Sequence, residues 1–290
     1  MAGLRGQTRG SARRLQLAGN MKTNIVSLSF LSIALTATSA AWATPVSDGE
    51  SPTAVVAGPV VRAPESATDP NLDRGILQPT AMTQPAGSLT YNNYELLLHG
   101  FTYGFTDRLQ ASVTVFSPIV KDMPFVGLAA VKWRLISAGR LHVAVQGSTA
   151  YAHEFSGDAL SSTSVYSVGA GAFASYCLRQ DCSSLLSGSA SYQVAMANGI
   201  DDRAQFVVYG GSIVHRVTPH IKLLGEVTSA AGKTPNGDLS NVSGALASYG
   251  VRFHTGNIAS DIGFVKPILS DGSDPFILGL PFVNVSYRWQ

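Results

Sequence analysis

The chain has 290 residues, 45% of them hydrophobic and 13% charged, with 20 Lys or Arg, 18 Asp or Glu and a formal net charge of +2. Five of the basic residues and none of the acidic ones lie before residue 44, so the remainder carries 15 basic against 18 acidic side chains. The pI near 8.5 therefore reflects the amino-terminal end. The remainder lacks the excess of basic residues that nucleic-acid binding requires.

Residues 1–43 have the features of a secretory signal peptide. Met21-Lys22 opens a basic start, residues 25–35 form an apolar run, and Ala41-Trp42-Ala43 is a small-x-small cleavage site. The apolar run is shorter than the roughly 20 residues that a membrane-spanning helix needs. Residues 1–20 are either an extended basic start or lie upstream of a true start at Met21, and we favour Met21.

Residues 44–87 contain seven of the 14 prolines and show no sustained periodicity. Such a composition cannot bury a core and is typical of extended or flexible segments. We expect a flexible periplasmic lead that acts as a plain tether. Two alternatives remain: residues 76–81 pack at the entrance of the domain that follows, or the lead enters that domain and blocks it.

Beyond Gly87, alternation of apolar and polar residues predicts strands in twelve segments. Most have 9–13 residues, against about 9–11 for a tilted strand that crosses a bilayer and five or six in soluble proteins. A count of ten strands is the alternative. The segments are 88–94, 97–105, 109–117, 125–135, 141–151, 164–176, 184–196, 204–216, 219–229, 242–253, 257–268 and 275–289.

The connections between these segments are alternately short and long, as in an up-and-down barrel with short periplasmic turns and longer external loops. The first connection, Glu95-Leu96, is too tight for a long loop. Either the first segment is not a separate strand, or it continues into the second.

The last segment has an apolar face formed by Val283, Val285, Tyr287 and Trp289. Together with the aromatic ending, it resembles the final strand of bacterial outer-membrane β-barrel proteins, although Gln290 follows the last aromatic. The resemblance extends over residues 88–290 and is one of architecture. It implies that these four residues are the insertion signal recognised by the barrel-insertion machinery. It also implies that the other partner is outer-membrane lipid.

We therefore predict an all-β fold, a closed antiparallel up-and-down transmembrane barrel in the bacterial outer membrane. Lipid offers no hydrogen bonds, so strands with an apolar outer face must close on themselves. A soluble β-sandwich would also show alternation. Aromatic residues near strand ends favour the membrane barrel, because Tyr and Trp prefer the bilayer interfaces.

Inward-facing titratable residues are the candidate pore lining, and several lie near the short turns. A basic collar there would bias a passage toward anions. The alternative is a set of internal ion pairs with Glu226 and Asp261 as acceptors. Phe116 and Phe173 would narrow the lumen if they point inward. The candidates are Lys132, Arg134, His142, Lys222, Glu226, Arg252, Asp261 and Arg288.

Cys177 and Cys182 are the two cysteines of the chain. In an exported protein we expect them to form a structural disulfide that closes a short loop. Further metal ligands do not stand nearby in the sequence, so we predict no metal site. No phosphate-binding loop or cofactor motif is apparent, and we predict no cofactor.

The sequence favours a structural barrel or a narrow passive pore with weak anion preference. One alternative is an outer-membrane hydrolase that acts on lipid or peptide through an external loop, where His153-Glu154 lies near Ser156 and Asp158. These residues lack the spacing of known catalytic motifs, so we predict that the chain is not an enzyme. The other alternative is a surface-exposed binding protein.

Overall fold

The computed structural model describes residues 69–290 except 117–124, 154–163, 199–202, 234–240 and 270–277. Among these residues, no helix has the length and the apolar character needed to cross a membrane. The strands are β1 (Leu89–Tyr94), β2 (Leu98–Thr106), β3 (Leu109–Phe116), β4 (Phe125–Ala138), β5 (Leu141–His153), β6 (Ser164–Cys177), β7 (Leu185–Ala197), β8 (Arg203–Thr218), β9 (Ile221–Lys233), β10 (Asn241–Thr255), β11 (Ile258–Leu269) and β12 (Leu280–Trp289).

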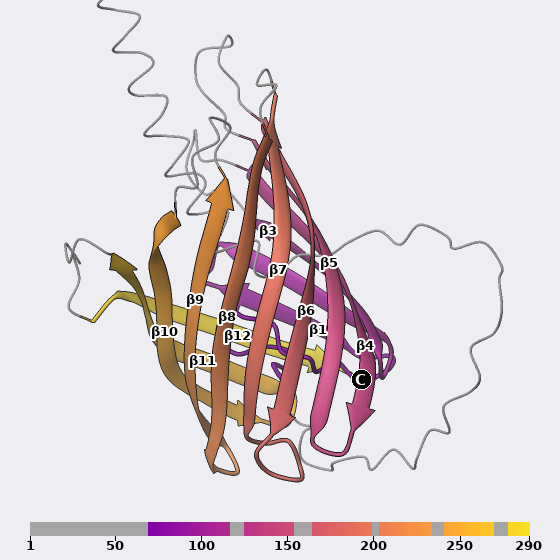
Figure 1. Ribbon diagram of the computed structural model, residues 1–290. Coiled ribbons are helices and arrows are strands. Elements are labelled where there is room, and N and C mark those ends of the chain that lie inside the picture. Colours follow the sequence, from indigo (N-terminus) through magenta and orange to yellow (C-terminus); the bar gives the residue numbers. More distant parts are fainter. Residues whose placement is uncertain (1–68, 117–124, 154–163, 199–202, 234–240, 270–277) are drawn as a thin grey trace, which may run out of the picture. The chain divides into compact units, whose positions relative to one another are not determined.

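Each strand pairs antiparallel with the next, and β12 returns to pair with β1, from Leu89 opposite Trp289 to Tyr94 opposite Asn284 (Figure 1). The sheet is therefore a closed barrel with no free edge. The predicted fold class and the count of twelve strands are confirmed. The last strand begins later than predicted, at Leu280, and residues 270–277 of the expected segment lie outside the described residues.

The two faces of the sheet differ as the alternation predicts. Outward-facing Leu186, Tyr192 and Leu223 are exposed, whereas inward-facing Ser187 and Glu226 are buried. Exposed apolar side chains repeat around the outer wall, as required of a surface that faces acyl chains. Trp133, Tyr176, Tyr287 and Trp289 are among the exposed aromatics near strand ends.

The first connection is a tight turn of three residues, 95–97, between β1 and β2. Glu95 and Leu96 have φ of 54° and 62°, the left-handed conformation that a type I′ hairpin turn requires at both central positions. Two hydrogen bonds to Val283 hold the turn. The N–H of Glu95 donates to the carbonyl oxygen of Val283 (3.0 Å), and the N–H of Val283 donates to the carboxylate of Glu95 (2.6 Å). The first segment is thus a separate strand, and the doubt about it is resolved.

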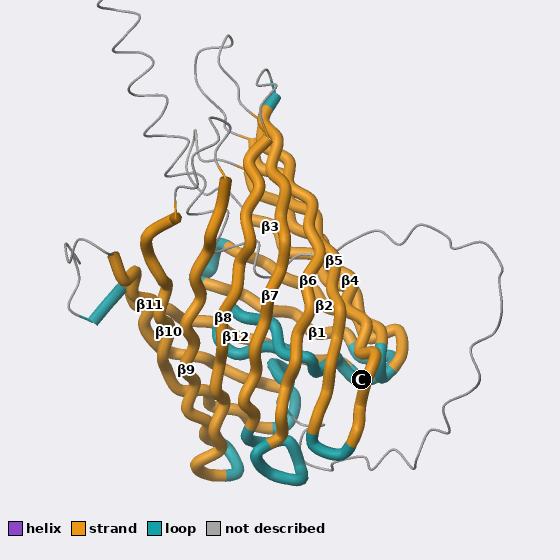
Figure 2. The backbone as a smooth tube through the Cα atoms, in the orientation of Figure 1, coloured by secondary structure: helices purple, strands orange, loops and turns teal. Residues whose placement is uncertain are grey.

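Residues 69–87 are here called the inner segment (Figure 2, teal). Residues 69–84 lie inside the barrel, and residues 85–87, of which Ala86 and Gly87 are exposed, connect them to β1. Asp69 contacts Arg288 and Thr83 contacts Asp107, so both ends of the segment lie at the end of the barrel that carries the short turns and the carboxyl terminus, here called the short-turn end. Residues 69–84 are buried except for Arg74 and Leu77, which are half-buried. The expectation of a plain tether is therefore wrong for residues 69–87, and residues 44–68 of the expected lead lie outside the described residues.

Candidate functional site

The candidate site is the contact between the inner segment and the inner wall of the barrel. Seven of the eight predicted lining residues are buried on that wall. The eighth, Arg134, lies at the short-turn rim, where its guanidinium donates to the carbonyl oxygen of Asp107. The structure brings six of the buried residues into direct contact with the inner segment. They are Lys132, Lys222, Glu226, Arg252, Asp261 and Arg288.

Asp69 is the first described residue of the inner segment and faces three cations of the wall. Lys222 Nζ donates to its Oδ2 at 2.6 Å, and Arg252 Nη1 lies 3.4 Å from the same oxygen. Arg288 Nη1 donates to its backbone carbonyl at 3.2 Å. Burial by itself would raise the pKa of Asp69, but the charges of Lys222 and Arg252 outweigh burial and hold that pKa well below its usual value. Asp69 is therefore bound as a carboxylate.

Arg252 on β10 binds both the wall and the inner segment. Its Nε and Nη2 donate to the two carboxylate oxygens of Asp261 on β11, at 2.6 and 3.0 Å. The same guanidinium donates to the backbone carbonyls of Asn71 (2.8 Å) and Gly75 (2.5 Å). A bidentate pair with Asp261 fixes the guanidinium plane, so the remaining N–H groups point at the inner segment.

Glu226 on β9 is held by backbone amides. The N–H groups of Ile76, Leu77 and Gln78 donate to its carboxylate at 2.6, 2.9 and 3.2 Å. Consecutive N–H groups that converge on one anion form a nest. The predicted alternative expected Glu226 to accept an ion pair. The structure instead shows backbone N–H groups of the inner segment as its donors. Asp261 does accept an ion pair as that alternative expected.

A second set of contacts holds the opposite side of the inner segment. Lys132 Nζ on β4 donates to the backbone carbonyls of Asp73 (3.0 Å) and Thr80 (3.1 Å). Gln110 on β3 donates to the Asp73 carboxylate at 2.9 Å and accepts from the N–H of Gln84 at 2.7 Å. Burial opposes ionisation of Asp73, yet Arg74 and Lys132 lower its pKa to about 2.

The inner segment is also linked to the seam where β12 meets β1. The Asn71 side chain donates to Asp261, and Asn284 on β12 donates to the same carboxylate, both at 3.3 Å. Asn284 also donates to Ser286, which donates to Asn92 on β1 at 2.8 Å. A chain of buried polar side chains thus runs from the inner segment across the closing pair of strands.

Apolar side chains of the inner segment pack in a cluster with the wall. Leu72, Ile76 and Met82 are buried with wall residues and with the Cys177–Cys182 disulfide. The predicted disulfide is confirmed. Burying an aliphatic side chain of this size stabilises by about 1.5–3 kcal/mol, so this cluster adds to the polar contacts that hold the segment. The full set is Leu72, Ile76, Met82, Tyr94, Cys177, Cys182, Leu185, Val214, Leu224 and Phe282.

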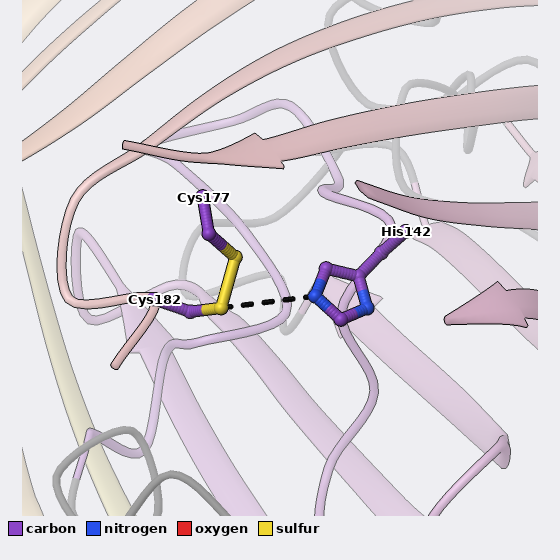
Figure 3. A group of neighbouring side chains, drawn as sticks. All are labelled: His142, Cys177 and Cys182. Atoms are coloured by element: carbon purple, nitrogen blue, oxygen red, sulfur yellow. Dashed lines mark hydrogen bonds between the residues drawn. A yellow bond between two sulfur atoms is a disulfide. The ribbon is translucent and has the colours of Figure 1, made fainter. Parts of the chain in front are cut away.

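His142 lies beside that disulfide at the short-turn end (Figure 3). Its Nε2 is 3.7 Å from Cys182 Sγ, and its Nδ1 is 2.9 Å from Ser137 Oγ. The three side chains are close enough to surround a metal ion. However, the two sulfurs are bonded to each other, and a disulfide lacks the thiolates that ligate metals.

A small cavity lies beside the inner segment. A cavity of about 20 Å³ lies against Gln78 and Pro79, lined on the wall by Ser and Gln side chains and by Phe173. A space of that volume holds about one water molecule. Phe173 points inward and is buried against Ala81 and Ala144. Phe173 and the inner segment therefore fill the same part of the lumen. Phe116, the last residue of β3, is half-buried.

The candidate catalytic residues in the external loop are only partly described. His153 is at the end of β5, where its Nδ1 is 2.8 Å from Ser164 Oγ on the neighbouring strand. Its ring stacks on Tyr151, with 6.3 Å between centroids. Both contacts place His153 on the outer face of the barrel. Glu154, Ser156 and Asp158 lie outside the described residues.

Sequence reasoning missed the residues of the inner segment that bind the wall, above all Asp69, Asp73 and Gln78. A signal was present in the charges. The predicted inward cations outnumber the predicted inward carboxylates, and buried charges require partners. Asp69 and Asp73 supply two of the missing carboxylates.

No protein-family model matches the chain, and no curated protein matches it. Solved structures do match, at low identity. OmpT of Vibrio cholerae is 12% identical over 66% of this chain, which spans 64% of the OmpT chain, with a TM-score of 0.38. The NanC porin is 9% identical over 69% of this chain and 97% of its own, with a TM-score of 0.39. LpxR from Salmonella typhimurium is 9% identical over 70% of this chain and 99% of its own, with a TM-score of 0.42.

These neighbours are bacterial outer-membrane barrels, and this chain has a closed antiparallel barrel as they do. They also correct one prediction. We expected from the absence of motifs that the chain is not an enzyme, but the neighbours include LpxR, a barrel of the enzymatic type, beside a porin.

Proposed function

We propose that this outer-membrane barrel is a pore that its own inner segment holds closed at rest, and that prefers anions when the segment leaves. The observation that carries the proposal is the position of the inner segment, whose oxygen atoms bind the cations of the inner wall. Lys132, Lys222, Arg252 and Arg288 all donate to the segment. If the segment left, these cations would face a wet lumen and attract anions.

The size of the barrel supports a passage. Eight strands leave room for side chains or one small ligand, and sixteen to eighteen leave an aqueous channel. A twelve-strand barrel lies between these sizes. Gly171, Ser189 and Ser191 line the wall opposite Gln78 and Pro79 of the inner segment. Their small side chains leave space inside the barrel.

A second candidate function is a permanently filled, structural barrel. The buried hydrogen bonds from the inner segment to β12 and across the closing seam favour it, because such contacts stabilise the closed wall. In that case the segment would never leave and the barrel would carry no current.

Planar-bilayer recordings distinguish the two functions. The processed chain and a variant without residues 69–84 would be refolded in detergent, and heat-modifiable gel migration would verify that both form barrels. The pore predicts a low conductance for the full chain, a stable larger conductance for the deletion variant, and a reversal potential shifted toward anions. Lys222→Glu in the deletion variant should reduce that shift. A folded deletion variant without conductance would leave the structural function.

A further inference from the structure

The carboxylate of Asp69 occupies a position that the wall has prepared for an anion. Its Oδ2 lies 2.6 Å from Lys222 Nζ and 3.4 Å from Arg252 Nη1, and its Oδ1 accepts the N–H of Asn71 at 2.9 Å. The side chains of Lys222, Arg252 and Asp69 are 1–3% exposed. The two cationic donors to Oδ2 come from the wall strands β9 and β10. The N–H donor to Oδ1 belongs to the inner segment itself.

The charges of the wall show why an anion is needed there. Lys222, Arg252 and Arg288 provide three cations. The wall strands provide two carboxylates: Asp261 is bound by Arg252, and Glu226 is held by amides of the inner segment. Without Asp69, Lys222 Nζ would lose its carboxylate partner in a buried position. An uncompensated buried charge is strongly unfavourable, so the wall without the segment would take an anion from solution.

We propose that Lys222 and Arg252 form a binding site for small carboxylate solutes, and that Asp69 is a built-in ligand that occupies this site at rest. This inference rests on the proposed function, since a solute reaches the site only if the inner segment leaves it. The chemical class follows from Asp69 itself, because the group that the two cations now hold is a carboxylate, with one oxygen facing both Lys222 Nζ and Arg252 Nη1. The tethered Asp69 competes at an effective concentration of about millimolar or more, so free carboxylates bind the wild-type site weakly.

Chemical rescue tests the site. Asp69→Ala removes the carboxylate but keeps Cβ, so it leaves a space of the size of formate. In the refolded full chain, Asp69→Ala should lower the temperature at which heat-modifiable migration is lost, and formate should restore most of that loss. Chloride at equal ionic strength and formamide, the neutral analogue, should not restore it. The double variant Asp69→Ala/Lys222→Met should gain nothing from formate. Equal effects of formate, chloride and formamide on Asp69→Ala would overturn the proposal.

If Asp69→Ala does not refold, the wild-type chain provides the test. Trypsin cleavage after Arg74 reports release of the inner segment, and the product beginning at Gly75 is identified by its mass. Acetate should accelerate this cleavage several-fold over chloride at equal ionic strength, and an equal rate would overturn the proposal. Both assays are independent of conductance. A rescued site in a barrel that carries no current would refute the pore alone, and a conducting deletion variant without rescue would refute the carboxylate site alone.

Discussion

Gly75 of the inner segment and Glu226 of β9 are in such close contact that a Cβ on Gly75 would overlap the Glu226 carboxylate. The lack of a side chain at Gly75 lets the next three N–H groups reach that carboxylate. This is a close backbone approach, one of the uses of glycine that a larger residue cannot replace. The contact between the inner segment and Glu226 therefore requires that residue 75 has no side chain.

Gly75→Ala should release the inner segment without affecting the barrel. The new Cβ would push the turn away from Glu226 and weaken three hydrogen bonds to a charged group, each worth about 1.5–3 kcal/mol. We expect trypsin cleavage after Arg74 to rise at least tenfold and bilayer conductance to increase. Gly188→Ala is the matched control, because its nearest neighbour is the carbonyl oxygen of Gly210 at 3.9 Å. Unchanged cleavage in Gly75→Ala would show that the segment does not depend on this contact.

Glu226→Gln should have a similar effect through chemistry instead of size. The glutamine keeps the shape but replaces one acceptor oxygen by an NH₂ group that faces the N–H groups of Ile76, Leu77 and Gln78. Donors that face donors leave buried groups unsatisfied, at a cost of about 1–3 kcal/mol. Cleavage after Arg74 should rise about 10- to 100-fold. Glu95→Gln, at the hairpin that binds Val283, should leave the cleavage rate unchanged, and an equal rise there would indicate a general loss of stability.

Acid should release the inner segment. The pKa of Asp73 is lowered to about 2 and that of Asp69 is lowered further, from a usual value of 3.8. A carboxyl group with a lowered pKa stabilises the bound form above the usual pKa and loses that contribution as the pH falls toward the lowered value. The binding of the inner segment to the wall should therefore be constant above about pH 5 and weaken between about pH 4 and pH 2.

Bilayer conductance across this range is the measurement, since trypsin is inactive in acid. We expect conductance to rise reversibly below pH 4, and Asp73→Asn to be more conductive than the wild type at neutral pH and to change less in acid. Conductance that stays low down to pH 2 would show that the two carboxylates do not control the binding of the inner segment to the wall.

The strands could be predicted because their signal is local. In β7, Ser187, Ser189 and Ser191 alternate with outward apolar residues over a length that only a bilayer requires, and the structure keeps this register. The inner segment has no such period. Its partners are far away in sequence, as between Asp69 and Lys222, which are separated by 153 residues. Its backbone groups bind inward side chains instead of neighbouring strands. A local pattern cannot predict such a segment, although the excess of inward cations indicates that an acidic partner is needed.

The terminal strand allows a prediction about assembly. Val283, Val285, Tyr287 and Trp289 all lie exposed on the outer face of β12, as expected for the insertion signal that we infer for them. Tyr287 and Trp289 contact each other edge to face, with 4.7 Å between ring centroids. The inward-facing Asn284 and Ser286 of the same strand form hydrogen bonds inside the barrel. We therefore expect the outer face of β12 to be the face that is recognised before the barrel closes.

Tyr287→Ser/Trp289→Ser should therefore slow assembly more than it weakens the assembled barrel. The double variant removes two aromatics from the interface between bilayer and water, where their rings are favoured, but leaves the Asn284–Ser286–Asn92 chain intact. In lipid vesicles with purified insertion machinery, we expect heat-modifiable barrel to form at least tenfold more slowly than for wild type. Spontaneous refolding in detergent should reach the same yield. Tyr192→Ser/Tyr209→Ser, which removes exposed aromatics from the outer faces of β7 and β8, is the matched control. Equal slowing in both double variants would mean that the terminal strand is not specifically recognised.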